Sequence, residues 1–171
     1  MEHKLDISIQ ARYYSYGNPQ AKTLLLALHG YGQLGAWFLK KFESLDPDDY
    51  YVVVPEGLHR FYLSGASGRV GASWMTKEDR ETDIANYIGY LDAVLSQVNP
   101  SNAYSRTILL GFSQGGATAS RYLALGKQSF TGFILWAAVF PQDMEQNRYA
   151  RFQHSKNFLV VGDQDKYYKP A

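Results

Sequence analysis

Ser113 stands at the centre of the run GFSQG at residues 111–115 and is the leading candidate for a nucleophile. A serine that attacks an acyl carbonyl is often held on a sharp turn between a strand and a helix, with glycine two positions before and two after it. The apolar residues 107–110 precede this run, and a helical pattern follows it from Ala117. The positive end of that helix would favour the negative charge that develops in acyl transfer. The pattern therefore predicts acyl-transfer chemistry at Ser113, against the alternative of an ordinary glycine-rich turn.

A second run, LHGYG at residues 28–32, follows another apolar strand. Acyl transfer needs N–H groups that point at the oxyanion of the tetrahedral intermediate. One donor commonly comes from a loop of this kind and the other from the residue after the nucleophile, so we expect the backbone N–H groups of Tyr31 and Gln114 to form the oxyanion hole. His29 lies in the same run and is therefore a candidate for the catalytic base. We expect it instead to be structural, with its ring fixing the loop through hydrogen bonds.

An acidic candidate follows in the run GDQD at residues 162–165, directly after the last apolar segment. The chain order of serine and then aspartate suits a catalytic triad of this type. Asp165 lies deeper in the expected loop and is preferred as the acid. Asp163 is the alternative, although we expect it to cap or brace the loop.

The histidine that would activate Ser113 is missing from the expected place, because nothing after Asp165 is a histidine. Serine needs a base to take its proton. His154 precedes the last strand and should lie at the wrong edge of the sheet. His59, in a long loop on the correct side, could approach Ser113 and stays open as a substitute. We expect the sequence to be C-terminally truncated, without the last strand, the last helix and the histidine loop.

Short apolar segments alternate with helical patterns along the chain, which predicts a mostly parallel sheet with helices on both faces. A single domain is expected over residues 1–171. Residues 5–16 predict an antiparallel edge strand or one arm of a hairpin, and residues 56–75 predict a long glycine-containing loop with a functional use. Strands are expected at residues 23–28, 51–54, 107–110, 132–138 and 157–161, and helices at residues 34–45, 76–98 and 117–125.

Composition restricts the partners. Hydrophobic residues make up 46% of the chain, charged residues 19%, and the formal net charge is +1, so neither nucleic acid nor an anionic membrane is indicated. Cysteine is absent, which excludes disulfides and cysteine-built metal sites. No signal-peptide pattern or bilayer-length apolar run occurs, so we expect a cytoplasmic protein without stable membrane insertion. The oligomeric state is not indicated.

Together these runs resemble the phospholipase/carboxylesterase family of α/β-hydrolases, which includes the acyl-protein thioesterases and small bacterial carboxylesterases. The resemblance rests on the runs LHGYG, VPEG, SW, GFSQGG and GDQD at residues 28–32, 54–57, 73–74, 111–116 and 162–165. It implies an α/β-hydrolase fold, no metal or organic cofactor, and a small-molecule ester or acylated substrate. It also implies that Trp74 and residues 58–71 border an acyl pocket. The runs RFYL at residues 60–63 and GRV at residues 68–70 differ from the proline-rich sequence usual in the family at this place. The substrate specificity of the family therefore cannot be transferred to this chain.

The function expected is hydrolysis of carboxylic esters or thioesters through an acyl-serine intermediate. Two alternatives are open. The first is a catalytically inactive binding protein on the same fold, and the second is an acyltransferase or peptidase that uses the same nucleophile. Because the histidine is missing, we expect this chain to hydrolyse p-nitrophenyl esters poorly.

Overall fold

A six-stranded sheet forms the centre of the computed structural model, which describes residues 1–144 and 146–165. The strand order is β1-β3-β2-β6-β7-β8, and every neighbouring pair is parallel except β1 with β3. This confirms the predicted mostly parallel sheet. The strands are β1 (Tyr13–Gly17), β2 (Thr23–Leu28), β3 (Tyr50–Pro55), β6 (Arg106–Phe112), β7 (Gly132–Trp136) and β8 (Lys156–Val160).

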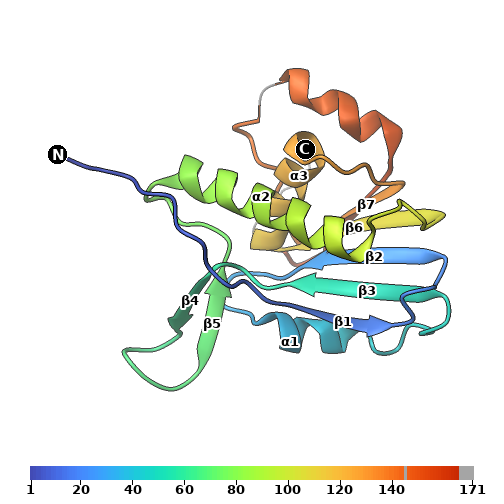
Figure 1. Ribbon diagram of the computed structural model, residues 1–171, viewed down its shortest axis with the longest axis horizontal. Coiled ribbons are helices and arrows are strands. Elements are labelled where there is room, and N and C mark those ends of the chain that lie inside the picture. The colour runs from blue at the N-terminus through green and yellow to red at the C-terminus, as the bar shows by residue number, and fades with distance from the viewer. Residues whose placement is uncertain (145, 166–171) are drawn as a thin grey trace.

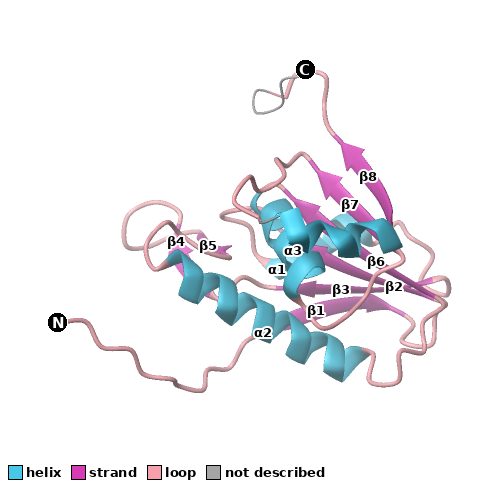
Figure 2. Ribbon diagram, turned by 90° about the horizontal axis from the view of Figure 1, so that it is seen from above, coloured by secondary structure: helices cyan, strands magenta, loops and turns pink. Residues whose placement is uncertain are grey.

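Helices cover both faces of this sheet, as predicted (Figures 1 and 2). One face carries α2 (Arg80–Val98), α3 (Gln114–Leu125) and the 3-10 helix η2 (Gln146–His154). The other carries α1 (Gly35–Leu39) and the short 3-10 helix η1 (Lys40–Phe42). All six residues of β2 are buried, because β2 lies inside the sheet and has a hydrophobic cluster on each side.

The register of the parallel strands brings their carboxyl ends to one edge of the sheet. Leu28, the last residue of β2, lies opposite Gly111 of β6. Further across, Phe112 lies opposite Trp136, and Trp136 lies opposite Val160 of β8. The segments that follow β2, β6 and β8 therefore start close to the same edge, where open α/β sheets usually hold their ligands.

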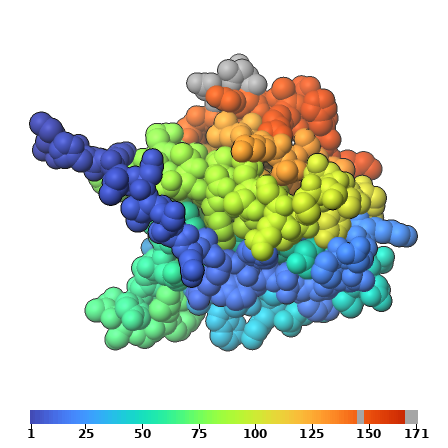
Figure 3. Space-filling model, viewed as in Figure 1, coloured from blue at the N-terminus to red at the C-terminus, as the bar shows by residue number. Residues whose placement is uncertain are grey.

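The predicted edge strand over residues 5–16 is only partly present. β1 begins at Tyr13, and residues 1–12 form no helix or strand. Figure 3 shows the start of this segment projecting from the body of the molecule, while Lys4 Nζ lies 2.6 Å from Oδ1 of Asp79 and Arg12 Nε lies 2.7 Å from Oε1 of Glu56. Leu5, Ile7 and Ile9 alternate as a strand would, yet the side chains of all three are exposed.

The long loop predicted over residues 56–75 is instead a hairpin. Its strands are β4 (His59–Tyr62) and β5 (Val70–Ser73), which pair antiparallel and separately from the main sheet. The hairpin is fastened to the loop after β2 by a bridge between Gln33 and Ala72, and it extends outward beside α1 in Figure 1. The helix predicted over residues 34–45 is likewise broken into α1 and η1.

β8 forms one edge of the sheet, and all five of its residues are exposed. Figure 2 shows it as the outermost strand beside β7. None of the helices in the described residues is long and apolar enough to cross a bilayer.

Candidate functional site

Ser113 lies at the turn between β6 and α3, with φ 53° and ψ −120°. A non-glycine residue with positive φ is uncommon, because such strain costs about 1–3 kcal/mol and persists only where the surroundings enforce it. The backbone N–H of Ser113 donates to the carbonyl of Trp136 at 3.0 Å, so a hydrogen bond to the end of β7 holds the turn in place. The residue is exposed, and its hydroxyl is therefore accessible to a ligand.

The space around this turn is as restricted as the sequence predicted. A Cβ on Gly111 would lie 2.3 Å from the carbonyl oxygen of Gly115, and a Cβ on Gly115 would lie 2.3 Å from that of Leu28. Only glycine lets β6, α3 and the end of β2 approach so closely. The first N–H groups of α3 have no acceptor within the helix, and that of Gln114 is the first of them.

The loop after β2 lies directly beside Ser113. A Cβ on Gly30 would be 3.2 Å from the Cβ of Ser113. The side-chain carbonyl of Gln33 accepts the N–H of Gly30 at 2.9 Å, which fixes the turn. The N–H of Tyr31 has no acceptor among residues 1–144 and 146–165. The structure thus brings the loop that carries Tyr31 to Ser113 and Gln114, and their use as oxyanion donors stays a prediction.

His29 is a structural residue, as the sequence predicted. Its ring is fully buried, with Nε2 accepting the N–H of Gly57 at 2.9 Å and Nδ1 lying 2.8 Å from the carbonyl of Gly30. Because Nε2 accepts a hydrogen bond, it carries no hydrogen in the neutral ring, and Nδ1 carries the ring hydrogen and donates it to the Gly30 carbonyl. Burial lowers the pKa of His29, and this outweighs the opposing effect of the Gly30 carbonyl. Both ring nitrogens are occupied, so His29 has no nitrogen left to serve Ser113 as a base.

Trp74 lies in the core beneath the site. Its side chain is 1% exposed and belongs to the core cluster under α2 and α3. The indole N–H donates to the carbonyl of His29 at 2.8 Å. In this position Trp74 supports the loop after β2, and the substrate contact that the resemblance implied for it stays a prediction.

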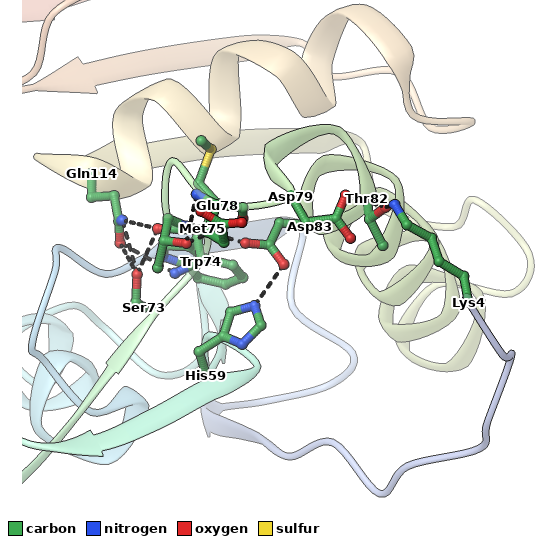
Figure 4. Close-up of polar contacts among 11 residues, drawn as sticks. Lys4, His59, Ser73, Trp74, Met75, Glu78, Asp79, Thr82, Asp83 and Gln114 are labelled. Atoms are coloured by element: carbon green, nitrogen blue, oxygen red, sulfur yellow. Dashed lines mark hydrogen bonds and ion pairs between the residues drawn. The ribbon is translucent and has the colours of Figure 1, made fainter. Parts of the chain in front are cut away.

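The Gln114 side chain crosses to the segment after β5 (Figure 4). Its Oε1 accepts the backbone N–H of Trp74 at 3.2 Å, and its Nε2 donates to the carbonyl of Met75 and to Ser73 Oγ at 3.0 Å each. The residue next to Ser113 therefore holds the end of the β4–β5 hairpin against the start of α3.

His59 is bound to an acid other than the one considered from sequence. Its Nε2 lies 2.9 Å from Oδ1 of Asp83, in the first turn of α2. Oδ2 of the same carboxylate accepts the backbone N–H of Thr76 at 3.1 Å. In Figure 4 the His59 ring points toward Asp83, on the side away from Gln114. Asp83 thus fastens β4 to the segment before α2, and no described contact joins His59 to Ser113.

Asp165 lies in a turn after β8, where its N–H donates to the carbonyl of Gly162 at 3.1 Å. β8 and β6 are separated only by β7, so their carboxyl ends are roughly 10 Å apart. Asp165 is half-buried and Asp163 is exposed. This spacing leaves room for a side chain between the acid and Ser113, and the choice of Asp165 over Asp163 stays a prediction.

His154 lies at the end of η2, two residues before β8 begins, which is the amino end of that strand as expected. Histidine does not occur among residues 166–171, which lie outside the described part of the chain. In residues 1–144 and 146–165, no group of three or more His, Asp or Glu side chains is placed to hold a metal ion.

Sequence reasoning missed two anchors of this site. Gln33 directly follows the run LHGYG, and this position after two glycines was the feature of the sequence that could have indicated its role in holding the loop. Glu56 is buried, with Oε1 at 2.7 Å from Nε of Arg12 and Oε2 accepting the N–H of Gly35 at 3.0 Å. The two donors to Glu56 lie 44 and 21 residues away along the chain, so no local pattern indicated its role.

Residues 19–171 match the model of the family described as serine hydrolase (FSH1). The chain belongs to the FSH1 serine hydrolase family. Comparison with curated protein sequences finds no match.

Solved structures similar to this FSH1-family chain include esterases and a thioesterase. Zea mays acyl-protein thioesterase 2 superposes with TM-score 0.68 at 17% identity, over 92% of this chain and 80% of that one. A Bacillus cereus carboxylesterase gives 0.66 at 17% identity, over 93% and 74%. A phospholipase/carboxylesterase from Dyadobacter fermentans gives 0.63 at 14% identity, over 95% and 93%. The predicted α/β-hydrolase fold and the resemblance to these esterases are confirmed.

Proposed function

We propose that the chain hydrolyses carboxylic esters or thioesters through an acyl-serine intermediate on Ser113. The observation that carries this proposal is the exposed Ser113 at φ 53°, between the first N–H of α3 and the loop of Tyr31. Strained backbone clusters at functional sites. Membership of a serine hydrolase family supports the same reaction.

In the proposed reaction Ser113 Oγ bonds to the acyl carbon while its proton passes to a base. The backbone N–H groups of Tyr31 and Gln114 stabilise the oxyanion, and the alcohol or thiol leaves with a proton. Water then attacks the acyl-serine, which releases the acid and restores the hydroxyl. Asp165 orients a histidine in this scheme, and that histidine is not one of the four in the chain.

The occupied ring of His29 and the pairing of His59 with Asp83 favour a second candidate. This is a binding protein on the same fold in which Ser113 does not react. It differs from the hydrolase in one measurable respect, the reactivity of the Ser113 hydroxyl.

Added imidazole can act as a base in place of an absent histidine. The rate of ester hydrolysis is therefore measured at increasing concentrations of imidazole. We expect slow release of p-nitrophenol from p-nitrophenyl butyrate, and an increase with imidazole above the uncatalysed rate. A fluorophosphonate should label Ser113. Both signals should disappear in Ser113→Ala and persist in Ser64→Ala, which alters an exposed serine in the β4–β5 connection. A rate and labelling that survive in Ser113→Ala, or their absence from the unaltered chain with imidazole, would refute the proposal.

A further inference from the structure

A groove of about 620 Å³ opens between the loop after β2, α1 and the β4–β5 hairpin. Gly32 and Gln33 of the loop form one end of it. The hairpin is held in place there because the N–H of Gly32 donates to Ala72 at 2.9 Å and that of Ala72 donates to Gln33 at 3.1 Å. A Cβ on Gly71 would lie 2.4 Å from the carbonyl oxygen of Gly32, so the two backbones are in close contact. The groove is therefore built by fastened segments.

Two residues of this groove connect it to the turn of Ser113. Gln33, which lines it, also holds Gly30 through the hydrogen bond from the Gly30 N–H. Gly30 in turn packs against Ser113. Phe38 lines the groove and stacks on Phe112, the residue before Ser113, with ring centroids 5.9 Å apart. Two residues that line the groove are therefore only one contact away from the turn that holds Ser113.

The wall on the α1 side is apolar and exposed. Trp37 lines the groove with 66% of its surface exposed, although it is one of the largest hydrophobic side chains of the chain. Lys40 Nζ lies 4.2 Å from the centre of its ring. An exposed aromatic surface beside a cavity commonly marks a binding site for an apolar ligand.

The charge of the groove is positive. Lys41 lines it from η1 and Arg69 from the β4–β5 hairpin, and no Asp or Glu in the described part of the chain lines it. Neither cation forms an ion pair with any residue in the described part of the chain. The buried Glu56 nearby is already bound by Arg12 and Arg60. Two cations facing a cavity without counter-charge attract an anion.

We propose that this groove binds the far end of the acyl group, with an apolar stretch on Trp37 and a carboxylate between Lys41 and Arg69. The substrates would be half-esters or half-thioesters of dicarboxylic acids. This inference rests on the proposed function only for the position of the scissile ester, because the binding of the carboxylate itself needs no reaction at Ser113.

The test compares the binding of monomethyl suberate, which has one carboxylate, with that of dimethyl suberate, which has none. Ser113→Ala is used as the background so that no ester is cleaved, and the Trp37 indole N–H signal in NMR reports occupancy of the groove. At low ionic strength we expect the monoester to bind about three- to tenfold more tightly, as two exposed charge pairs allow. High salt should remove this preference.

Lys41→Gln combined with Arg69→Gln should abolish the preference for the monoester. Lys22→Gln is the matched control, since it removes a lysine just before β2, at the opposite edge of the sheet. It should leave the preference unchanged. Equal binding of the two esters, binding of neither, or a preference that survives the double substitution would overturn the inference. None of these results depends on whether Ser113 reacts with a fluorophosphonate, so the two proposals fail separately.

Discussion

The indole N–H of Trp74 donates to the main-chain carbonyl of His29, and the two rings lie 5.0 Å apart. His29 in turn accepts the N–H of Gly57. Through these contacts the end of β5, the loop after β2 and the segment after β3 form one hydrogen-bonded unit. The loop that carries Tyr31 is held in place from the core side.

Trp74→Phe should therefore destabilise the protein. The buried carbonyl of His29 would lose its donor, which costs about 1–3 kcal/mol. Trp37→Phe is the matched control, because Trp37 is exposed, and it should change the free energy of unfolding much less. Urea denaturation of both variants measures the difference. Equal effects would show that the indole hydrogen bond contributes nothing.

Gly115→Ala should be strongly destabilising, by more than about 2 kcal/mol, because the new Cβ would meet the carbonyl of Leu28 and the backbone cannot yield cheaply. Gly89→Ala is its control in α2, where a Cβ meets nothing within 4 Å. That change should stabilise the protein by about 0.5–1 kcal/mol, since alanine favours helix over glycine. Thermal unfolding should shift in opposite directions for the two variants, and a shared direction would contradict the crowded turn.

Gln114→Ala should loosen the end of the hairpin without unfolding the molecule. The N–H of Trp74 loses its acceptor and the carbonyl of Met75 loses its donor. We expect the Trp74 amide to exchange with solvent at least about tenfold faster, as the loss of roughly 1.4 kcal/mol implies. Gln97→Ala, an exposed change in α2, should leave that exchange rate unaltered. Unchanged protection in Gln114→Ala would show that the side chain does not hold this segment.

His29 should make stability depend on pH. Burial places its pKa below the usual value, so the unfolded chain binds the proton more tightly than the folded one. The stabilising contribution is complete above about pH 6.5, the ordinary pKa of histidine, and is lost as the pH falls from there toward the lowered pKa.

Urea midpoints between about pH 5 and 8 measure this dependence. His29→Gln should give a less stable protein with a flatter profile in this range. His154→Gln, which alters an exposed histidine, should keep the slope of the unaltered chain. An equally steep profile in His29→Gln would assign the pH dependence to other groups.

The sequence predicted the buried strands well, because β2 and β3 are continuous apolar runs that need cover on both faces. It did not predict the hairpin of β4 and β5. Little of β4 is buried, and the hairpin is held by contacts with distant residues, among them Phe61 on Tyr31 and Gly71 on Gly32. Such contacts leave no period in the local sequence.

The residues of the candidate site also differ in how far the sequence could predict their positions. Glycine spacing and chain order were enough to place Ser113, Tyr31 and Gln114 at one edge of the sheet. The pairing of His59 with Asp83 could not be predicted, because an acidic residue at position 83 is equally typical of the first turn of a helix, where it stabilises the helix dipole. The buried position of Trp74 depends on the folding of the hairpin, which the sequence did not reveal.

The positive φ of Ser113 also affects how the molecule unfolds. The conformation exists only while β6, α3, β7 and the end of β2 are all in place, since each supplies one of the contacts that enforce it. Partial opening of any of these elements would let the serine relax to an ordinary backbone and would disperse the N–H groups around it. Reactivity at Ser113 would then be lost cooperatively with this part of the sheet, while fraying of the N-terminal segment would leave it intact.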